Sequence, residues 1–103
     1  MSHELAEKTA GLASRVNSLI IFHTGEHCIK LLEEKDRLSK LLLAAIVKEL
    51  NQEHEAYKAA IAGMNEAIEF IGDADKELEG IAKAIRLIKK AIDSLEKALK
   101  KAI

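Results

Sequence analysis

The chain has 103 residues, of which 49% are hydrophobic and 32% charged, and it contains no proline. This composition excludes a disordered chain and predicts a single helical domain spanning residues 1–103. A net charge of −1 and an aromatic content of 3% argue against nucleic-acid binding, and the longest uncharged runs, 16–25 and 41–47, are too short for a bilayer helix of roughly 20 residues.

The first helix is predicted over residues 3–22. Its apolar residues recur on one helical face, at Leu5, Leu12, Val16, Leu19 and Ile20. The stretch HTGEHC, residues 23–28, follows directly. Gly25 can end the first helix there, and Thr24 can cap the next one.

The second helix is predicted to begin near residue 26, from the apolar series Leu31, Leu32, Leu38, Leu41, Leu42, Ala45 and Ile46. Residues 48–60 contain only one weak helix breaker, Asn51, so two architectures are open. A break near Asn51 gives four helices and a bundle closed within one chain. Without a break, one helix runs over 26–71, roughly 69 Å long at about 1.5 Å per residue.

The continuous helix is the favoured prediction, because Asn51 lacks the glycine that marks both other turns. Such a molecule is two helices thick at every level and cannot cover its own apolar stripes. It would therefore form a homodimer with a four-helix cross-section.

The third apolar stripe comprises Tyr57, Ile61, Met64, Ile68 and Ile71, with a backward extension through Leu50, Ile46 and Leu43. Gly72 can end that helix, Asp73 can cap the next, and Asp75 would add negative charge to its first turn. The last helix is predicted over 74–102. Its apolar residues follow the 3.5-residue spacing of a coiled coil: Ile81, Ile85, Ile88, Ile92, Leu95, Leu99 and Ala102. The fold class is thus all-α, an antiparallel bundle of three to four long helices.

Charge is segregated along the second half of the chain. Residues 51–80 are mainly acidic and residues 81–103 mainly basic, so the two segments complement each other if they pack antiparallel. The basic amphipathic segment 81–103 also offers an alternative function, binding to an anionic membrane surface or to a partner protein.

His23 and His27 are the candidate metal ligands. On a continuous helix, residues four apart share a face, and two such histidines can bind zinc or another divalent ion, for example across a dimer axis. His23, Glu26 and His27 also fit the pattern HxxEH and so resemble the inverted zinc-protease motif, although over only five residues. The favoured interpretation is different: if Thr24 and Gly25 form a turn, the two histidines lie in different helices and the stretch is a helix junction.

No catalytic constellation is found. The chain has no ExxH pair of the kind used by di-iron bundles and no glycine-rich phosphate loop, and Cys28 is expected to behave as a small core residue. We therefore expect no enzyme activity and no cofactor apart from the metal alternative at His23 and His27. The predicted function is that of a self-associating helical interaction or structural module.

The predicted location is the cytoplasm. Cys28 is the one cysteine in the chain and cannot form an internal disulfide, which fits a reducing compartment. Glu4 and Glu7 stand where a secretory signal would carry positive charge followed by an apolar run.

Overall fold

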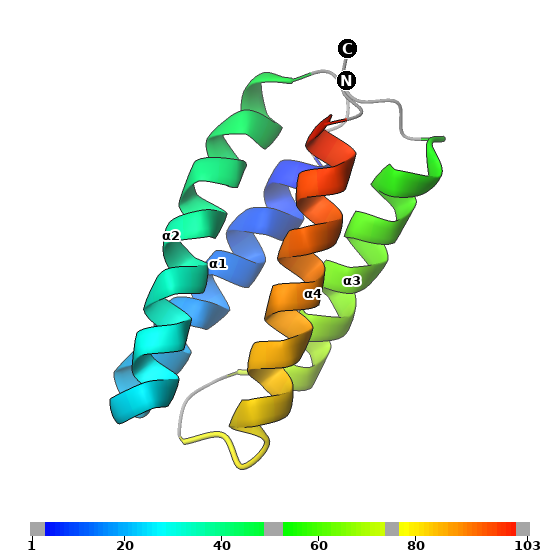
Figure 1. Ribbon diagram of the computed structural model, residues 1–103. Helices are drawn as coiled ribbons and strands as arrows, with labels where there is room; N and C mark the ends of the chain where they lie inside the picture. The colour runs from blue at the N-terminus through cyan, green and yellow to red at the C-terminus, as the bar shows by residue number, and fades with distance from the viewer. Residues whose placement is uncertain (1–3, 49–52, 74–76, 101–103) are drawn as a thin grey trace.

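The described residues of the protein form a bundle of four helices. The computed structural model describes residues 4–48, 53–73 and 77–100, and contains α1 (Glu4–Phe22), α2 (Gly25–Val47), α3 (Glu55–Ile71) and α4 (Ile81–Lys100) (Figure 1). The bundle measures 39 × 21 × 18 Å along its principal axes. The all-α prediction is confirmed.

The helices form two antiparallel hairpins joined by a diagonal connection. The main contacts are α1 with α2, α3 with α4, α2 with α4, and α1 with α3, so α2 and α3 occupy opposite corners of the bundle. Each helix runs opposite to the one before it (Figure 1). Neighbours from different hairpins are consequently parallel, and α2 and α4 end at the same end of the molecule.

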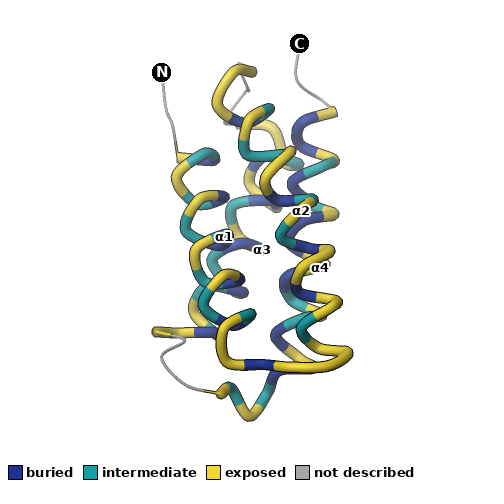
Figure 2. Tube along the Cα trace, turned by 90° about the vertical axis from the view of Figure 1, so that its left-hand side faces the viewer, coloured by how far each residue is buried: buried dark blue, intermediate teal, exposed yellow. Residues whose placement is uncertain are grey.

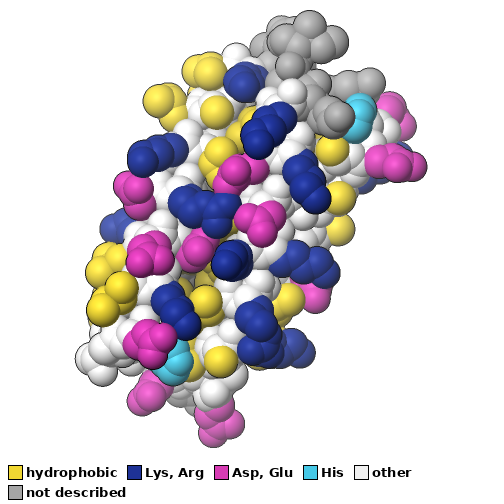
Figure 3. All heavy atoms as spheres, in the orientation of Figure 1, with side chains coloured by type: hydrophobic (Ala, Val, Ile, Leu, Met, Phe, Trp, Pro, Cys, Tyr) yellow, Lys and Arg dark blue, Asp and Glu magenta, His cyan; other side chains and the backbone are white. Residues whose placement is uncertain are grey.

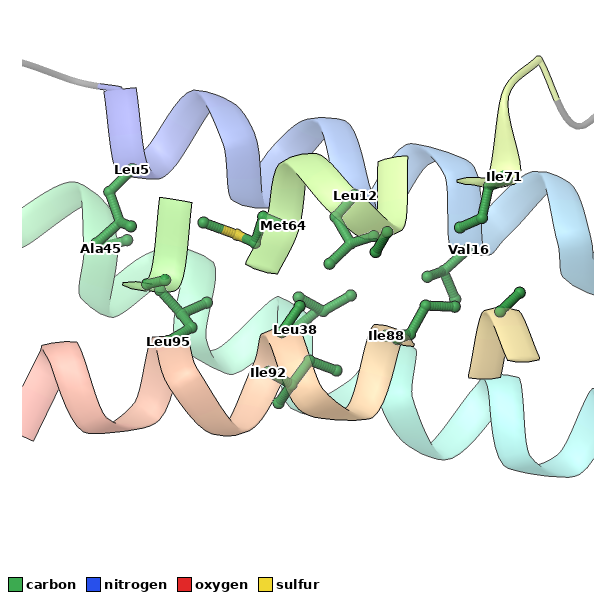
Figure 4. Close-up of a cluster of buried hydrophobic side chains, with 14 of the residues drawn as sticks. Leu5, Leu12, Val16, Leu38, Ala45, Met64, Ile71, Ile88, Ile92 and Leu95 are labelled. Carbon is green, nitrogen blue, oxygen red and sulfur yellow. The ribbon is translucent and has the colours of Figure 1, made fainter. Parts of the chain in front are cut away.

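All four helices contribute apolar side chains to one core. Each turns its buried residues inward and its exposed residues outward (Figure 2). The close-up in Figure 4 shows side chains of α1, α2, α3 and α4 meeting in the centre, among them Leu12, Val16, Leu38, Met64, Ile88, Ile92 and Leu95. The predicted stripes of α1 and α4 face the core. Their buried members are Leu5, Leu12, Val16, Leu19, Ile81, Ile88, Ile92, Leu95 and Leu99. Ile20 and Ile85 are partly buried against the core, and Ala102 lies outside the described residues.

The favoured prediction of one helix over 26–71 is wrong. The α2 helix ends at Val47, where Lys48 turns to extended backbone with φ −91° and ψ 141°. A new helix starts at Glu55, capped by His54, whose Nδ1 accepts the backbone N–H of Ala56 at 3.0 Å. Asn51, the residue proposed for the break, lies outside the described residues.

The helix ends at Val47 because four shorter helices can each bury one apolar face in a common core within one chain. An imidazole serves as the N-cap, so the new helix needs neither glycine nor proline at its start. The dimer was predicted from a molecule only two helices thick. The four-helix bundle does not have that thickness.

The predicted backward extension of the α3 stripe into α2 is also wrong. Leu43 and Ile46 are 66% and 55% exposed, and Leu32, assigned to the inner stripe of α2, is 48% exposed. The inner face of α2 consists of Leu31, Glu34, Leu38 and Ala45. The apolar residues of α2 thus belong to two different faces. Leu50, a member of the predicted extension, lies outside the described residues.

The last helix begins seven residues later than predicted, at Ile81 rather than at residue 74. The end of α3 is as expected, because Gly72 has φ 66° and ψ −140°, a conformation that only glycine adopts without strain. Asp73 is not the cap of α4, and Asp75 lies outside the described residues. The chain just before α4 is not helical, and the backbone N–H of Leu78 in this segment donates to His23.

Close contact between α3 and α4 depends on a small residue. A Cβ atom built on Gly63 would lie 3.4 Å from the Cα atom of Ala91, so the two backbones approach each other closely at this level. The glycine, unfavourable within a helix, is here compensated by helix packing.

Candidate functional site

The stretch HTGEHC forms the corner between α1 and α2. The α1 helix ends at Phe22, Thr24 occupies the N-cap position of α2 without a side-chain cap hydrogen bond, and Gly25 has φ 65°. His23 is 5% exposed, and its Nε2 accepts the backbone N–H of Leu78 at 3.2 Å. The corner therefore connects the first hairpin to the chain just before α4.

The two candidate ligands lie in different surroundings. His27 is in the first turn of α2 and is exposed, while the Nε2 lone pair of His23 is directed at Leu78. The continuous helix that would place His23, Glu26 and His27 on one face is interrupted at residues 23 and 24. In the described part of the chain, no three His, Cys, Asp or Glu side chains gather as a metal-binding group. A zinc site at His23 and His27 stays a prediction, and using His23 Nε2 would require breaking its bond to Leu78.

A cluster of ion pairs joins α2 to α4. The Arg37 guanidinium donates to Glu34 Oε2 at 3.1 Å, to Asp93 Oδ1 at 3.0 Å, and to Glu96. The hydrogen bond with Glu96 is the largest cause that raises the pKa of Arg37, followed by the interactions with Asp93 and Glu34, against desolvation. Arg37 is thereby held as a permanent cation whose donors are directed at three carboxylates, an arrangement suited to structure rather than to proton transfer.

Sequence reasoning missed this cluster. It considered charge between segments 51–80 and 81–103, and these ion pairs run between α2 and α4. The available signal was that Asp93 and Glu96 are the acidic residues within the basic segment 81–103. Between α3 and α4 the structure has a cation–π contact, with Lys83 Nζ 4.9 Å from the centroid of the Phe70 ring.

The exposed side of α4 carries a shallow basic groove of about 440 Å³, lined by Arg86, Lys89, Lys90, Asp93, Ser94 and Lys97. Basic side chains gather over this part of the surface (Figure 3). Such a groove can attract phosphate or carboxylate groups, although its cations lie along one exposed helix face.

A second groove, of about 390 Å³, lies against α3 and includes Glu4 of α1. Tyr57 lines it and is 6% exposed, and its hydroxyl has no hydrogen-bond partner among the described residues. The other lining residues are Glu53, Lys58, Ile61, Ala62 and Asn65. The groove is open and mixed in polarity, and it brings together no nucleophile and base.

The outer face of α2 is the third surface. We define it by six residues that alternate three and four positions apart: Ile29, Leu32, Asp36, Ser39, Leu43 and Ile46. All six are exposed, and the apolar ones are between 48% and 66% exposed. Figure 3 shows two apolar patches along the α2 edge of the molecule with charged side chains between them. An exposed apolar face of this kind on a helix is typical of a surface that contacts another protein.

Comparison with protein-family models, curated proteins and solved structures finds no match to this chain. Within the described residues, no helix combines the length and apolarity needed to cross a bilayer. Function must therefore be inferred from the surfaces described above.

We expect the two histidines to differ in their effect on stability. Replacing His23 with alanine removes the acceptor of the Leu78 N–H and should lower the free energy of unfolding by about 1–3 kcal/mol. Replacing exposed His27 should change it by less than about 0.5 kcal/mol. Denaturant unfolding measures both. Repeating it with zinc and with a chelator tests the metal site: zinc stabilisation lost in both variants would establish it, and unfolding that neither reagent alters would exclude it.

Replacing Arg37 with alanine should destabilise the bundle. Glu34, whose side chain is 12% exposed, would keep its charge without the guanidinium, so we expect a loss of about 1–3 kcal/mol in denaturant unfolding. The matched control is Lys30→Ala, which breaks the exposed pair with Glu26 and should cost at most about 1 kcal/mol. Equal effects of the two substitutions would show that the Arg37 cluster has no structural role.

Proposed function

We propose that this protein is a non-catalytic helical module that associates with itself. The observation that carries the proposal is the outer face of α2, where Ile29, Leu32, Leu43 and Ile46 remain exposed although the bundle already encloses a complete core. Apolar side chains arranged at helical spacing along one exposed face are typical of a surface that packs against another helix.

The energetics fit a reversible association. Fully burying a leucine or isoleucine contributes about 1.5–3 kcal/mol. The four apolar side chains of this face are roughly half exposed, so eight of them in a dimer would contribute roughly 6–12 kcal/mol. This is comparable to the 4–15 kcal/mol or more that association is estimated to cost in lost freedom. The association should accordingly depend on protein concentration.

The polar clusters support a structural role rather than catalysis. The donors of Arg37 are directed at carboxylates, and Nε2 of His23 is engaged by Leu78, so neither group is available to activate a substrate. Cys28 is a partly buried free thiol. We propose the cytoplasm as the location, because a single thiol fits a reducing compartment.

The basic groove on α4 favours a second candidate function. Arg86, Lys89, Lys90 and Lys97 could hold an anionic membrane surface through their charges. This attraction would be weakened by salt, in contrast to the apolar association at α2.

Light scattering across a concentration series tests self-association directly. We expect the mass to rise from one chain of 11.3 kDa towards twice that value, with little change when salt is raised or a chelator is added. A dimer that dissociates in chelator would favour metal-linked histidines. A mass of one chain at every concentration would contradict the proposal.

Co-sedimentation with anionic lipid vesicles tests the second candidate. Binding at low salt should be lost on Lys89→Glu combined with Lys90→Glu, because both side chains line the basic groove. Lys30→Glu on α2 is a charge-reversal control outside the basic groove. Vesicle binding that the α4 variant leaves unchanged, or no binding at all, would reject this function.

A further inference from the structure

The outer face of α2 reads the same from both of its ends. In chain order it has two apolar residues (Ile29 and Leu32), two polar residues (Asp36 and Ser39), and two apolar residues (Leu43 and Ile46). The spacings between them, three and four in alternation, are also unchanged on reversal. A face of this kind complements an antiparallel copy of itself.

We propose that the occupant of this face is a second copy of the chain, with the two α2 helices antiparallel about a two-fold axis at the level of residues 37 and 38. This inference rests on the proposed function and names its surface and register. In this register Ile29 lies opposite the partner's Ile46, and Leu32 lies opposite the partner's Leu43. Asp36 lies opposite the partner's Ser39, whose hydroxyl can donate to the carboxylate.

Charge complementarity selects this orientation. Glu33 and Lys40 are exposed and flank the outer face on the same side. In the antiparallel pairing Glu33 lies near the partner's Lys40, and Lys40 near the partner's Glu33, so two ion pairs border the contact. A parallel pairing would instead keep Glu33 and Lys40 on the opposite side of the contact from the partner's Lys40 and Glu33, so these ion pairs could not form, and it would place Asp36 beside its own copy, where like charges repel.

The face is free to accept a partner as it stands. Lys40 Nζ lies 3.1 Å from Asp36 Oδ2, but both side chains are about 70% or more exposed, so this pair can rearrange without exposing buried groups. The α2 helix occupies a corner of the bundle, and Figure 3 shows its apolar patches open on the surface. A 23-residue helix offers roughly 34 Å of contact length.

The register is tested with two single variants, Leu32→Lys and Leu43→Glu. Each introduces a charge opposite a leucine of the partner and should raise the dimer dissociation constant at least tenfold. An equal mixture of the two variants should dimerise again. In the mixed pair, the lysine introduced at position 32 faces the glutamate introduced at position 43, and the remaining Leu43 and Leu32 face each other. Light scattering gives the mass, and native mass spectrometry identifies the mixed dimer.

The matched control is a mixture of Leu32→Lys with Leu32→Glu. In the antiparallel register position 32 never faces position 32, so this mixture should remain monomeric. In a parallel pairing it would dimerise and the mixture with Leu43→Glu would not. Circular dichroism and thermal unfolding check that every variant keeps the helical fold.

A second pair of substitutions tests the same register at two exposed residues outside the core. Glu33→Lys should weaken the dimer by placing lysine near the partner's Lys40. Adding Lys40→Glu in the same chain should restore it. These variants decide the question if a leucine variant fails to fold.

The outcomes separate this inference from the proposed function. Unchanged dimers in Leu32→Lys and Leu43→Glu would keep self-association but overturn this surface. Dimers lost in the single variants and regained only in the position-32 mixture, or in neither mixture, would overturn the register. A wild-type chain that is monomeric throughout would overturn both and leave the face to a different apolar helix.

Discussion

The structure depends on one constraint: every apolar helix stripe has to be covered, and a chain of this size can cover only one stripe on each of its helices. Four helices around a common core satisfy this for the faces of α1, α3 and α4 and for the inner face of α2, where Leu31 and Leu38 are fully buried. The α2 helix carries a second stripe, and within the described residues no further helix covers it. This uncovered stripe is the reason to propose a partner.

The same constraint explains how much of the fold the sequence predicted. The stripes of α1 and α4 were correct because each contains one regular apolar series. The end of α3 at Ile71 was correct because Gly72 follows it directly, and Gly25, three residues after Phe22, marked the corner between α1 and α2. In α2, Leu31 and Leu32 are adjacent in sequence, but Leu31 is buried in the core and Leu32 is exposed on the outer face. Composition and spacing alone could not separate them. The break before α3 was the less favoured of the two predicted architectures because its cap is a histidine, His54, which sequence rules do not favour at that position.

The candidate site was predictable only in part. The spacing of His23 and His27 suggested a shared metal, while their separation by a turn was the preferred alternative and is the geometry found. What the sequence could not reveal was that His23 accepts a backbone N–H from Leu78, 55 residues away. The cluster around Arg37 was equally hidden, because its carboxylates come from Glu34 nearby and from Asp93 and Glu96 on another hairpin. Long-range polar contacts of this kind depend on which helices become neighbours, and the diagonal connection decides that.

The diagonal connection also has a consequence for how the chain folds. Within each hairpin, contacts are local in sequence and can form quickly, whereas docking one hairpin on the other requires contacts across half the chain. Polar contacts that bridge the hairpins are spread along the bundle: Thr9 with Met64, His23 with Leu78, Arg37 with Glu96, and Lys48 with the carbonyl of Leu99, at sequence separations of 51 to 59 residues. Apolar side chains alone would allow one hairpin to shift along the other by a helical turn. These directional bonds favour one docked alignment of the two hairpins over alignments shifted along the bundle axis.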